Sequence, residues 1–403
     1  MARLGRSEAD GEAAVGALES APEPRLWIER IQLTDFRNYA AHVMKAGPAP
    51  VVLCGANGAG KTNLLEAISL LSAGQGLRRA PLPDLARAGQ GSWAVAARLH
   101  TPAGIYNVGT GLADAEPGAR ARRIVRINGE TQAGSGVLSD YAEMLWLTPA
   151  MDGLFTGPAA DRRRFLDRLI QCFDPSYRSQ LGQFERAMQQ RNRLLADNVS
   201  NGLRFEGFER VMGEAGVAIA ASRRVVLGEL RAAIVSRRAS RAGAAFPWAD
   251  VAICGTLEAD LETRPAIDVE DAYVLQLTHE RERDRAAGRA LAGPHRSDLL
   301  VGHGPKEMPA SVCSTGEQKA LLIGLVLAHA DLVRHRHGGV APILLLDEIG
   351  AHLDQARRAA LFDEIVDLGS QAWMTGTDFE AFSALRNRAQ FFAIDDGRID
   401  LRG

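Results

Sequence analysis

A glycine-rich loop between an apolar run and a helical run constrains the fold of this chain more than any other feature. The pattern G-x-x-x-x-G-K-[ST] is matched by Gly55, Ala56, Asn57, Gly58, Ala59, Gly60, Lys61 and Thr62. The loop follows the apolar run Pro50–Cys54, which predicts a buried strand, and a helix is expected to begin at Lys61. Glycines allow successive backbone N–H groups to turn inward around phosphate groups. The sequence therefore predicts an α/β fold with a phosphate-binding P-loop.

The last two residues of the loop predict the ligand more closely. The ammonium group of Lys61 can reach the β- and γ-phosphates of a nucleoside triphosphate, and the hydroxyl of Thr62 can bind Mg²⁺. The helix N-terminus adds a partial positive charge at the same place. The alternative is a chance glycine-rich turn, which the flanking strand and helix make improbable. ATP and Mg²⁺ are the predicted cofactors, and Lys61 is a predicted catalytic residue.

A pair of carboxylates lies at the end of a second apolar run. Ile343–Leu346 predicts a fully buried strand, and Asp347 and Glu348 follow it directly. In parallel α/β sheets, carboxylates at the carboxyl end of a strand lie in the crevice that binds phosphates. We therefore expect Asp347 to hold Mg²⁺ and Glu348 to activate the attacking water as a general base. The alternative, an ordinary acidic helix cap after a core strand, is weaker beside a P-loop.

A second anion site is predicted before this strand. The segment consists of Ser314, Thr315, Gly316, Glu317 and Gln318. It opens a long apolar helix over Lys319–Val333, and a serine hydroxyl with a glycine N–H at a helix N-terminus binds anions. The Ser-x-Gly-x-Gln pattern is similar to the signature of ABC-type ATPases, in which it contacts the γ-phosphate held by the opposite subunit. We expect Ser314, Gly316 and Gln318 to contact nucleotide in an ATP-dependent homodimer, although a plain Ser–Glu capping box is the competing interpretation.

Further positions were compared with the same class of ATPases. Leu353 and Asp354 fit the D-loop, which crosses the dimer interface in these proteins. Thr377 follows the strand predicted over Ala372–Thr375, where these ATPases often carry a switch histidine. The absence of that histidine favours slow hydrolysis and leaves Thr377 a weak candidate for sensing the γ-phosphate. Asp152 is a candidate for the contact made by the Q-loop.

The chain divides into a head and an insertion. Short β-like runs over residues 92–127 predict a meander of antiparallel strands, and apolar residues at helical spacing over 176–241 predict two antiparallel helices. The fold class is therefore an ABC-type P-loop head with an antiparallel β subdomain and an inserted helical lobe. The predicted segments are a disordered extension (1–25), the N-terminal part of the head (26–172), the lobe (173–290) and the C-terminal part of the head (291–403).

Four motifs together resemble those of the RecF family. They are L-T-D-F-R-N-Y over 33–39, R-R-R-F-L-D over 162–167, G-P-H-R-S-D-L over 293–299 and S-T-G-E-Q-K over 314–319. The resemblance implies an SMC-like ATPase head with a short lobe, acting as a weak DNA-stimulated ATPase and switch. It implies ATP-driven dimerisation on DNA at single-strand gaps or junctions, slow hydrolysis for release, and help to RecO and RecR in loading RecA. By resemblance Arg37 and Asn38 lie beside the nucleotide, and Arg296 either lines the pocket or braces the lobe junction.

Charge limits how this chain can bind DNA. It has 47 basic and 49 acidic residues, for a formal charge of −2, so only local patches can contact phosphates. Arg78 and Arg79, just after the first P-loop helix, are the preferred candidates, and a solvated helix face is the competing interpretation of any such cluster. The other candidates are Arg120, Arg122, Arg123, Arg126, Arg223, Arg224, Arg237, Arg238 and Arg241. Without base-reading motifs, contact to the backbone is expected.

Three other functions were weighed against this one. The ATPase subunit of a membrane transporter needs a membrane partner, a P-loop kinase does not need the Ser314 segment, and a chromosome-organising SMC ATPase needs longer arms. The four cysteines are isolated, which disfavours a metal site or a disulfide framework. No apolar run reaches membrane-spanning length, and residues 1–25 do not fit a signal peptide. A cytoplasmic location is expected.

Overall fold

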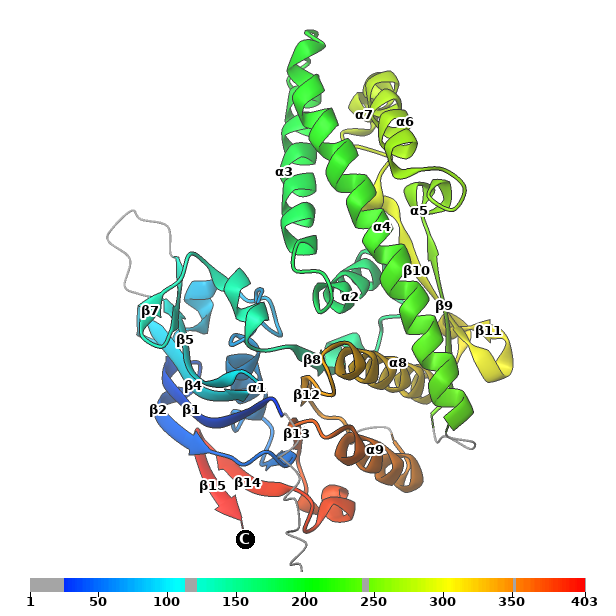
Figure 1. Cartoon of the computed structure of the whole chain (residues 1–403). Coiled ribbons are helices and arrows are strands. Elements are labelled where there is room, and N and C mark those ends of the chain that lie inside the picture. Colours follow the sequence, from blue (N-terminus) through cyan, green and yellow to red (C-terminus); the bar gives the residue numbers. More distant parts are fainter. Residues whose placement is uncertain (1–24, 113–121, 241–245, 351–352, 403) are drawn as a thin grey trace, which may run out of the picture.

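The computed structural model describes residues 25–112, 122–240, 246–350 and 353–402. The predicted extension over residues 1–25 lies outside this part of the chain except for Arg25. An α/β head is built from the two ends of the chain, and long helices from its middle rise from the head (Figure 1). The predicted fold class is confirmed. Among the described helices, none is both long and apolar enough to cross a membrane.

A six-stranded sheet lies at the centre of the head. Its order is β15 (Arg398–Arg402), β14 (Gln390–Asp395), β3 (Val51–Cys54), β13 (Ala372–Gly376), β12 (Ile343–Leu346) and β8 (Met144–Leu147). All neighbours are parallel except β14 and β15. Strands β3 and β12 are buried along their whole length, and alternate residues enter the two cores on either side of the sheet. The carboxyl ends of β3, β12 and β13 therefore meet at one edge.

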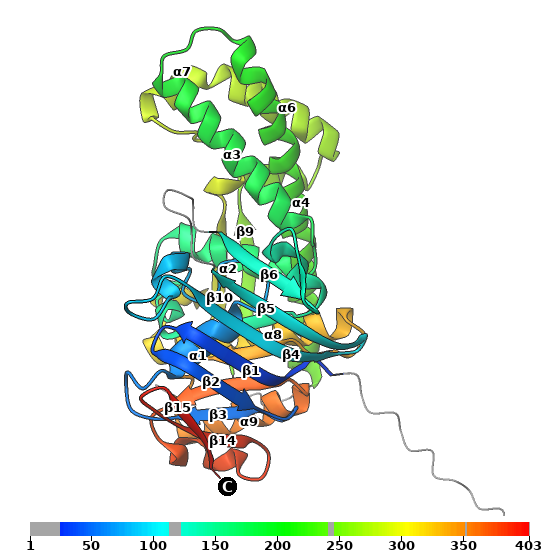
Figure 2. The same cartoon turned by 90° about the vertical axis from the view of Figure 1, so that its left-hand side faces the viewer.

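An antiparallel sheet covers one face of this layer, across helix α1 (Lys61–Ser69). Its order is β2 (Tyr39–Lys45), β1 (Trp27–Phe36), β4 (Trp93–Thr101), β5 (Gly104–Leu112), β6 (Arg123–Ile127) and β7 (Glu130–Thr131). Figure 2 shows β2 to β6 side by side, facing the viewer. The predicted meander is confirmed. Residues alternate between buried and exposed along β1 and β4, so the sheet packs one face on the core and presents the other to solvent.

Helices cover the opposite face and form the lobe. The described helices are α2 (Ala159–Gln171), α3 (Tyr177–Ala196), α4 (Leu203–Ser240), α5 (Thr256–Asp260), α6 (Ala266–His279), α7 (Arg281–Ala287), α8 (Thr315–Arg336) and α9 (Gln355–Leu368). Residues of α2, α8 and α9 share one core with the central sheet. Helices α3 and α4 pack against each other, as the helical spacing predicted. A small sheet, β11 (Met308–Pro309), β10 (Asp298–His303) and β9 (Ala249–Cys254), joins the lobe to the following part of the chain.

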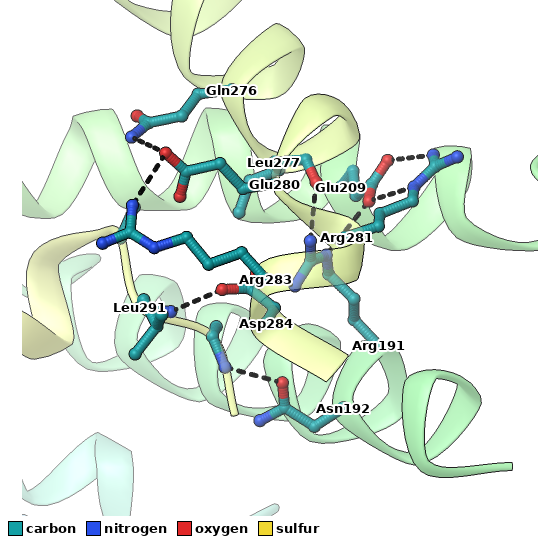
Figure 3. A network of polar contacts seen from close by, with 12 residues as sticks. Arg191, Asn192, Glu209, Gln276, Leu277, Glu280, Arg281, Arg283, Asp284 and Leu291 are labelled. Carbon is teal, nitrogen blue, oxygen red and sulfur yellow. Dashed lines mark hydrogen bonds and ion pairs between the residues drawn. The ribbon is translucent and has the colours of Figure 1, made fainter. Parts of the chain in front are cut away.

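A buried charge network holds the tip of the lobe together (Figure 3). Arg191 of α3 is completely buried, and it donates hydrogen bonds to Glu209 of α4 at 3.0 Å and to Asp284 of α7 at 2.6 Å. It also donates to the carbonyl of Leu277 at the end of α6, at 2.6 Å. Arg281 adds a second cation beside Glu209. One guanidinium therefore connects four helices.

Replacing Arg191 with methionine should destabilise the lobe strongly. The substitution keeps much of the side-chain volume but leaves Asp284 without its cation in a buried position, which costs about 3–5 kcal/mol in comparable cases. The measurement is the free energy of urea unfolding, followed by circular dichroism. Arg283→Met is the matched control, because Arg283 is 70% exposed and pairs with Glu280 at 3.6 Å. Equal, small losses in the two variants would contradict the assigned role of Arg191.

Candidate nucleotide site

The glycine-rich loop connects β3 to α1 at the edge where the parallel strands end. Gly60 adopts φ 114°, and a Cβ there would lie 2.5 Å from Nδ2 of Asn38. Gly55 is equally constrained, because its Cβ would lie 2.1 Å from the carbonyl oxygen of Ile394 on the neighbouring β14. A side chain at Gly55 would clash with the backbone of β14, and the positive φ of Gly60 strains any residue other than glycine. The loop is thus fixed by close packing to the strands on either side.

Lys61 folds back into the loop that precedes it. Its Nζ donates hydrogen bonds to the carbonyl oxygens of Gly55 at 2.6 Å and Ala56 at 2.8 Å, and the residue is 5% exposed. Burial lowers the pKa of the ammonium group, and the carboxylates of Glu348 and Asp347 act in the opposite direction. The cation is therefore held inside the loop, where phosphate oxygens could replace the two carbonyls as acceptors.

The two predicted Mg²⁺ ligands meet at the edge of the sheet. The hydroxyl of Thr62, at the start of α1, lies 3.0 Å from Oδ1 of Asp347, which follows β12. The hydroxyl of Thr375 lies 2.8 Å from the same carboxylate oxygen and accepts a hydrogen bond from the Glu348 N–H at 2.8 Å. Thr375 is completely buried near the end of β13. The structure thus joins residues 285 positions apart in the chain.

Glu348 differs from its neighbour in exposure. Asp347 is 7% exposed, whereas Glu348 is exposed. Glu348 has φ 50°, a left-handed conformation that costs a non-glycine residue on the order of 1 kcal/mol. This turn and the hydrogen bond to Thr375 separate the two carboxylates. The Asp347 carboxylate points toward Thr62, and the Glu348 carboxylate is accessible from solvent. Such local strain is commonly found at functional sites.

These residues fit a magnesium-bound triphosphate. A hydroxyl and a carboxylate supply only oxygen ligands, which Mg²⁺ prefers, and Mg²⁺ is usually held by one or two protein groups together with substrate phosphates. Among the described residues there is no cluster of three histidine, cysteine or acidic side chains that could hold a metal without such a substrate. Thr62 and Asp347 would hold the ion, and the backbone N–H groups of the loop with Lys61 would bind the phosphates.

Arg37 and Asn38 brace the loop from the turn between β1 and β2. Arg37 makes two hydrogen bonds, of 2.9 and 3.0 Å, to the buried carboxylate of Glu66 on α1. Asn38 donates to the Ala59 carbonyl at 3.1 Å and accepts from Asn63 at 2.8 Å. The roles of Glu66 and Asn63 were missed from the sequence, since nothing in the helix pattern marks a buried glutamate as the partner of an arginine 29 positions earlier.

Arg78 belongs to the same network. It donates to Asn63 at 2.9 Å and lies 3.3 Å from the Glu66 carboxylate, with its side chain 42% exposed. Arg79 is exposed and has φ 54°, a left-handed conformation. The two adjacent arginines therefore differ in their contacts. Arg78 contacts Asn63 and Glu66 of α1, whereas the side chain of Arg79 is exposed at the surface.

One of the other arginine candidates is wrong as a DNA contact. Arg223 is 2% exposed, and it pairs with Asp167 at 2.8 Å and with Glu258 at 3.2 Å inside the lobe. Its charge serves the packing of helices and cannot reach a phosphate backbone. Arg123 donates to the carbonyls of Leu70 and Gly74 and fixes the loop after α1. Two further candidates, Arg120 and Arg241, lie outside the described residues.

The Ser314 segment forms the exposed tip of α8. Ser314 is the N-cap: its hydroxyl accepts from the Glu317 backbone N–H at 3.4 Å, and its own N–H donates to the Glu317 carboxylate at 3.0 Å, which completes a capping box. A hydrogen bond from Lys306 lowers the pKa of Glu317 to about 2. Gln318 is buried and donates to the Cys313 carbonyl at 2.9 Å. Ser314 is exposed and Gly316 is half-buried.

A contact connects this tip to the central sheet. Lys319 of α8 is 4% exposed and lies 3.4 Å from a carboxylate oxygen of Asp152, just after β8. Asp152, the candidate for the Q-loop contact, therefore touches the helix that carries the signature. Asp354 caps α9 by accepting from the Arg357 N–H at 2.8 Å, while Thr377 is exposed after β13. Arg296 is exposed in the short turn before β10.

A P-loop between β3 and α1, a carboxylate pair after β12, an antiparallel subdomain and a helical lobe define an SMC-like ATPase head of the ABC class. The family model for the RecF/RecN/SMC N-terminal domain matches residues 27–397. The chain is 54% identical over 373 residues to the DNA replication and repair protein RecF of Mesorhizobium japonicum, covering 92% of this chain and 97% of that protein. It is 50% identical over 374 residues to RecF of Agrobacterium fabrum, covering 92% and 98%. The chain belongs to the RecF family.

The solved structures agree with this assignment at the level of the fold. A structure of the recombination mediator protein RecF with ATPrS, from the RecFOR pathway, superposes with a TM-score of 0.81. The two chains are 21% identical, with 94% of this chain and 98% of that chain covered. The corresponding RecF–ATP structure gives a TM-score of 0.78. The resemblance in the four sequence motifs is confirmed, and the transporter alternative is not favoured.

Proposed function

We propose that this protein is an ATP-dependent DNA-binding switch of recombinational repair and replication-fork maintenance. ATP binds at the P-loop of one copy, and the Ser314 tip of a second copy completes the binding site. The observation that carries this proposal is the contact between Thr62 and Asp347, which joins the loop to the carboxylate pair while Ser314, Thr315 and Glu348 remain exposed. One copy thus has the cradle and the ion ligands, and it leaves accessible the groups that another copy would meet.

The residues have distinct roles in this proposal. Lys61 would exchange its two carbonyl acceptors for phosphate oxygens, and Thr62 and Asp347 would hold Mg²⁺, which would neutralise phosphate charge. Glu348 orients the attacking water and accepts its proton. Arg37 and Asn38 keep the loop in position beside the nucleotide. Hydrolysis is slow and serves to release the dimer, in keeping with Thr377 in place of a switch histidine.

Family membership supports a proposal for the DNA and protein partners. We propose that dimers bind DNA at single-strand gaps or junctions through the phosphate backbone, without sequence specificity, and that RecO and RecR act with them in loading RecA. The relatives' name, DNA replication and repair protein, and the RecFOR pathway of the solved structures support this assignment. We propose the cytoplasm as the compartment. We propose the domain boundaries 26–172, 173–290 and 291–403 for the two parts of the head and the lobe between them.

Sedimentation velocity with a non-hydrolysable ATP analogue tests the proposal. The purified chain is expected to change from monomer to dimer when the analogue and Mg²⁺ are added, and gapped DNA should increase the dimer fraction at the same protein concentration. ADP and blunt duplex DNA are the controls. A chain that binds the analogue but remains monomeric, with or without DNA, would instead favour the closed monomer expected of a P-loop kinase.

Reversing the charge at Arg79 should weaken DNA binding without affecting the nucleotide. Arg79→Glu removes one exposed cation, so affinity should fall and the salt dependence of binding should decrease by about one released counterion. The measurement is fluorescence anisotropy with gapped DNA over a range of salt concentrations. Arg386→Glu is the control, since Arg386 is 68% exposed on a different part of the head. An unchanged affinity in Arg79→Glu would exclude this residue as a DNA contact.

A further inference from the structure

The solvent-exposed face of the antiparallel sheet carries a line of cations that the nucleotide site does not use. Arg30 of β1 lies directly opposite Lys45 of β2 and Arg98 of β4, and Arg126 of β6 lies opposite Gly109 of β5. We call Arg30, Lys45, Arg98 and Arg126 the basic face. All four are exposed, and they come from four of the strands that face the viewer in Figure 2. Neighbouring strands are about 4.8 Å apart, so the charges are closely spaced.

This register is unfavourable for the sheet by itself. Like charges directly opposite each other on neighbouring strands destabilise an antiparallel pair. Among the described residues, one acid lines the face: Glu29, whose carboxylate lies 3.2 Å from Arg98 and 2.7 Å from His100. Arg30 donates a hydrogen bond to the amide oxygen of Gln32 at 3.1 Å, and among the described residues no carboxylate lies within ion-pair distance of Arg30, Lys45 or Arg126. One carboxylate among four cations leaves a net positive charge on this face, which an acidic partner could neutralise.

The face is also hollowed. A trough of about 640 Å³ lies between the cations, and its lining includes Ala96, whose side chain is a single methyl group, and Gly109, which has none. The amides of Gln32 and Asn107 line it as neutral hydrogen-bonding groups. These small residues allow a backbone to approach closely, while the amides can bond to its peptide groups. In an extended chain, alternate side chains are about 6.8 Å apart, and the long arginine and lysine side chains on strands about 4.8 Å apart are flexible enough to reach them.

We propose that the basic face docks an extended acidic segment of a protein partner. Its carboxylates would pair with Arg30, Lys45, Arg98 and Arg126, and its backbone would lie over Ala96 and Gly109. Arginine is suited to this use because its planar fork binds carboxylates through two hydrogen bonds. The proposal is independent of the nucleotide site, because the face is on the solvent side of the sheet and α1 packs against the other side.

Nucleic acid fits the same face less well. Binding of single strands usually relies on aromatic side chains on which bases stack, and none of the described residues that line the trough is aromatic. Proteins that bind duplex DNA tightly make about 6–10 phosphate contacts, whereas this trough offers four cations and one acid. The charge is therefore sufficient for a short acidic peptide and too small for a duplex.

The proposal is tested with a short fluorescein-labelled polyglutamate peptide. Its affinity for the full chain is measured by fluorescence anisotropy at low salt. Replacing Arg30 and Arg126 with glutamine should weaken binding about tenfold, because two charge-assisted contacts are lost. The matched control replaces Arg283 and Arg386, which are 70% and 68% exposed elsewhere, and should change the affinity less than about twofold. Replacing Arg30 and Arg126 with lysine should retain most of the binding, and ATP affinity should be the same in all variants.

Three results would overturn the proposal. The wild-type chain could bind polyglutamate no better than polyglutamine, or the two double-glutamine variants could lose affinity equally. Alternatively, short duplex DNA measured in parallel could lose at least as much affinity as the peptide when Arg30 and Arg126 are replaced, which would assign the face to nucleic acid. Equal ATP binding in the variants distinguishes each of these results from misfolding.

Discussion

Glu348→Gln should produce a dimer that forms with ATP and does not separate. The amide keeps the size of the side chain and the hydrogen bond from the Glu348 backbone to Thr375, but it cannot accept a proton from water. Loss of a general base typically lowers the rate by a factor of about 10²–10⁴. ATP binding should be unaffected, because Lys61, Thr62 and Asp347 are unchanged. We therefore expect ATP turnover to fall at least hundredfold, in the range of such losses, while the ATP-bound dimer persists.

Turnover is measured by phosphate release and dimer lifetime by sedimentation after excess ATP is removed. Glu380→Gln is the matched control, since Glu380 is an exposed glutamate whose side chain pairs with Arg386 and contacts no residue of the P-loop among the described ion pairs and hydrogen bonds. It should behave as the wild type. Dimers of Glu348→Gln that hydrolyse ATP and separate at the wild-type rate would remove Glu348 as the general base.

Ser314→Arg should abolish dimerisation and leave ATP binding intact. Ser314 is exposed at the tip of α8, and a long cation there would occupy the space into which the second copy has to bring its phosphates. The substitution also removes the N-cap, which costs about 1 kcal/mol in other helices. That loss is small for a helix of 22 residues whose inner face is buried. The P-loop of the same copy makes no contact with Ser314 among the described hydrogen bonds.

Two variants separate the loss of the cap from the block at the interface. Ser314→Ala removes the same cap without filling the space and should dimerise, though more weakly. Ser176→Arg places an arginine at the exposed N-terminus of α3 and should dimerise normally. ATP affinity is measured with a fluorescent analogue. If Ser314→Arg loses ATP binding as the monomer, the residue acts within its own copy and the assignment to the partner's site is wrong.

Local patterns in the sequence predict much of the fold. The glycine-rich loop, the apolar strands before it and before Asp347, and the alternation along β1 each depend on neighbouring residues, so they can be read from short windows. The parallel sheet follows because one apolar run ends in the phosphate-binding loop and the other in carboxylates suited to the Mg²⁺ and the attacking water. The two long lobe helices follow from their 3.6-residue spacing.

Contacts between distant residues could not be predicted in this way. Thr375 reaches Asp347 only because β13 pairs with β12, and a threonine at the end of a strand has no distinctive pattern. Arg223 looks like a surface charge in the helix pattern of α4, but the packing of α2 and α5 buries it against Asp167 and Glu258. The basic face depends on the register of four strands. Such features arise from tertiary pairing.

The central claim is that each nucleotide is held by two copies, and mixing two defective variants tests it most directly. Lys61→Ala lacks the phosphate-binding lysine, and Ser314→Arg lacks the opposing tip, so neither should form ATP-dependent dimers alone. A mixed dimer contains one intact site, made from the P-loop of the Ser314→Arg copy and the Ser314 tip of the Lys61→Ala copy. We predict that sedimentation of the mixture with ATP shows mixed dimers. A mixture that remains as monomeric as its two components would contradict a site shared between copies.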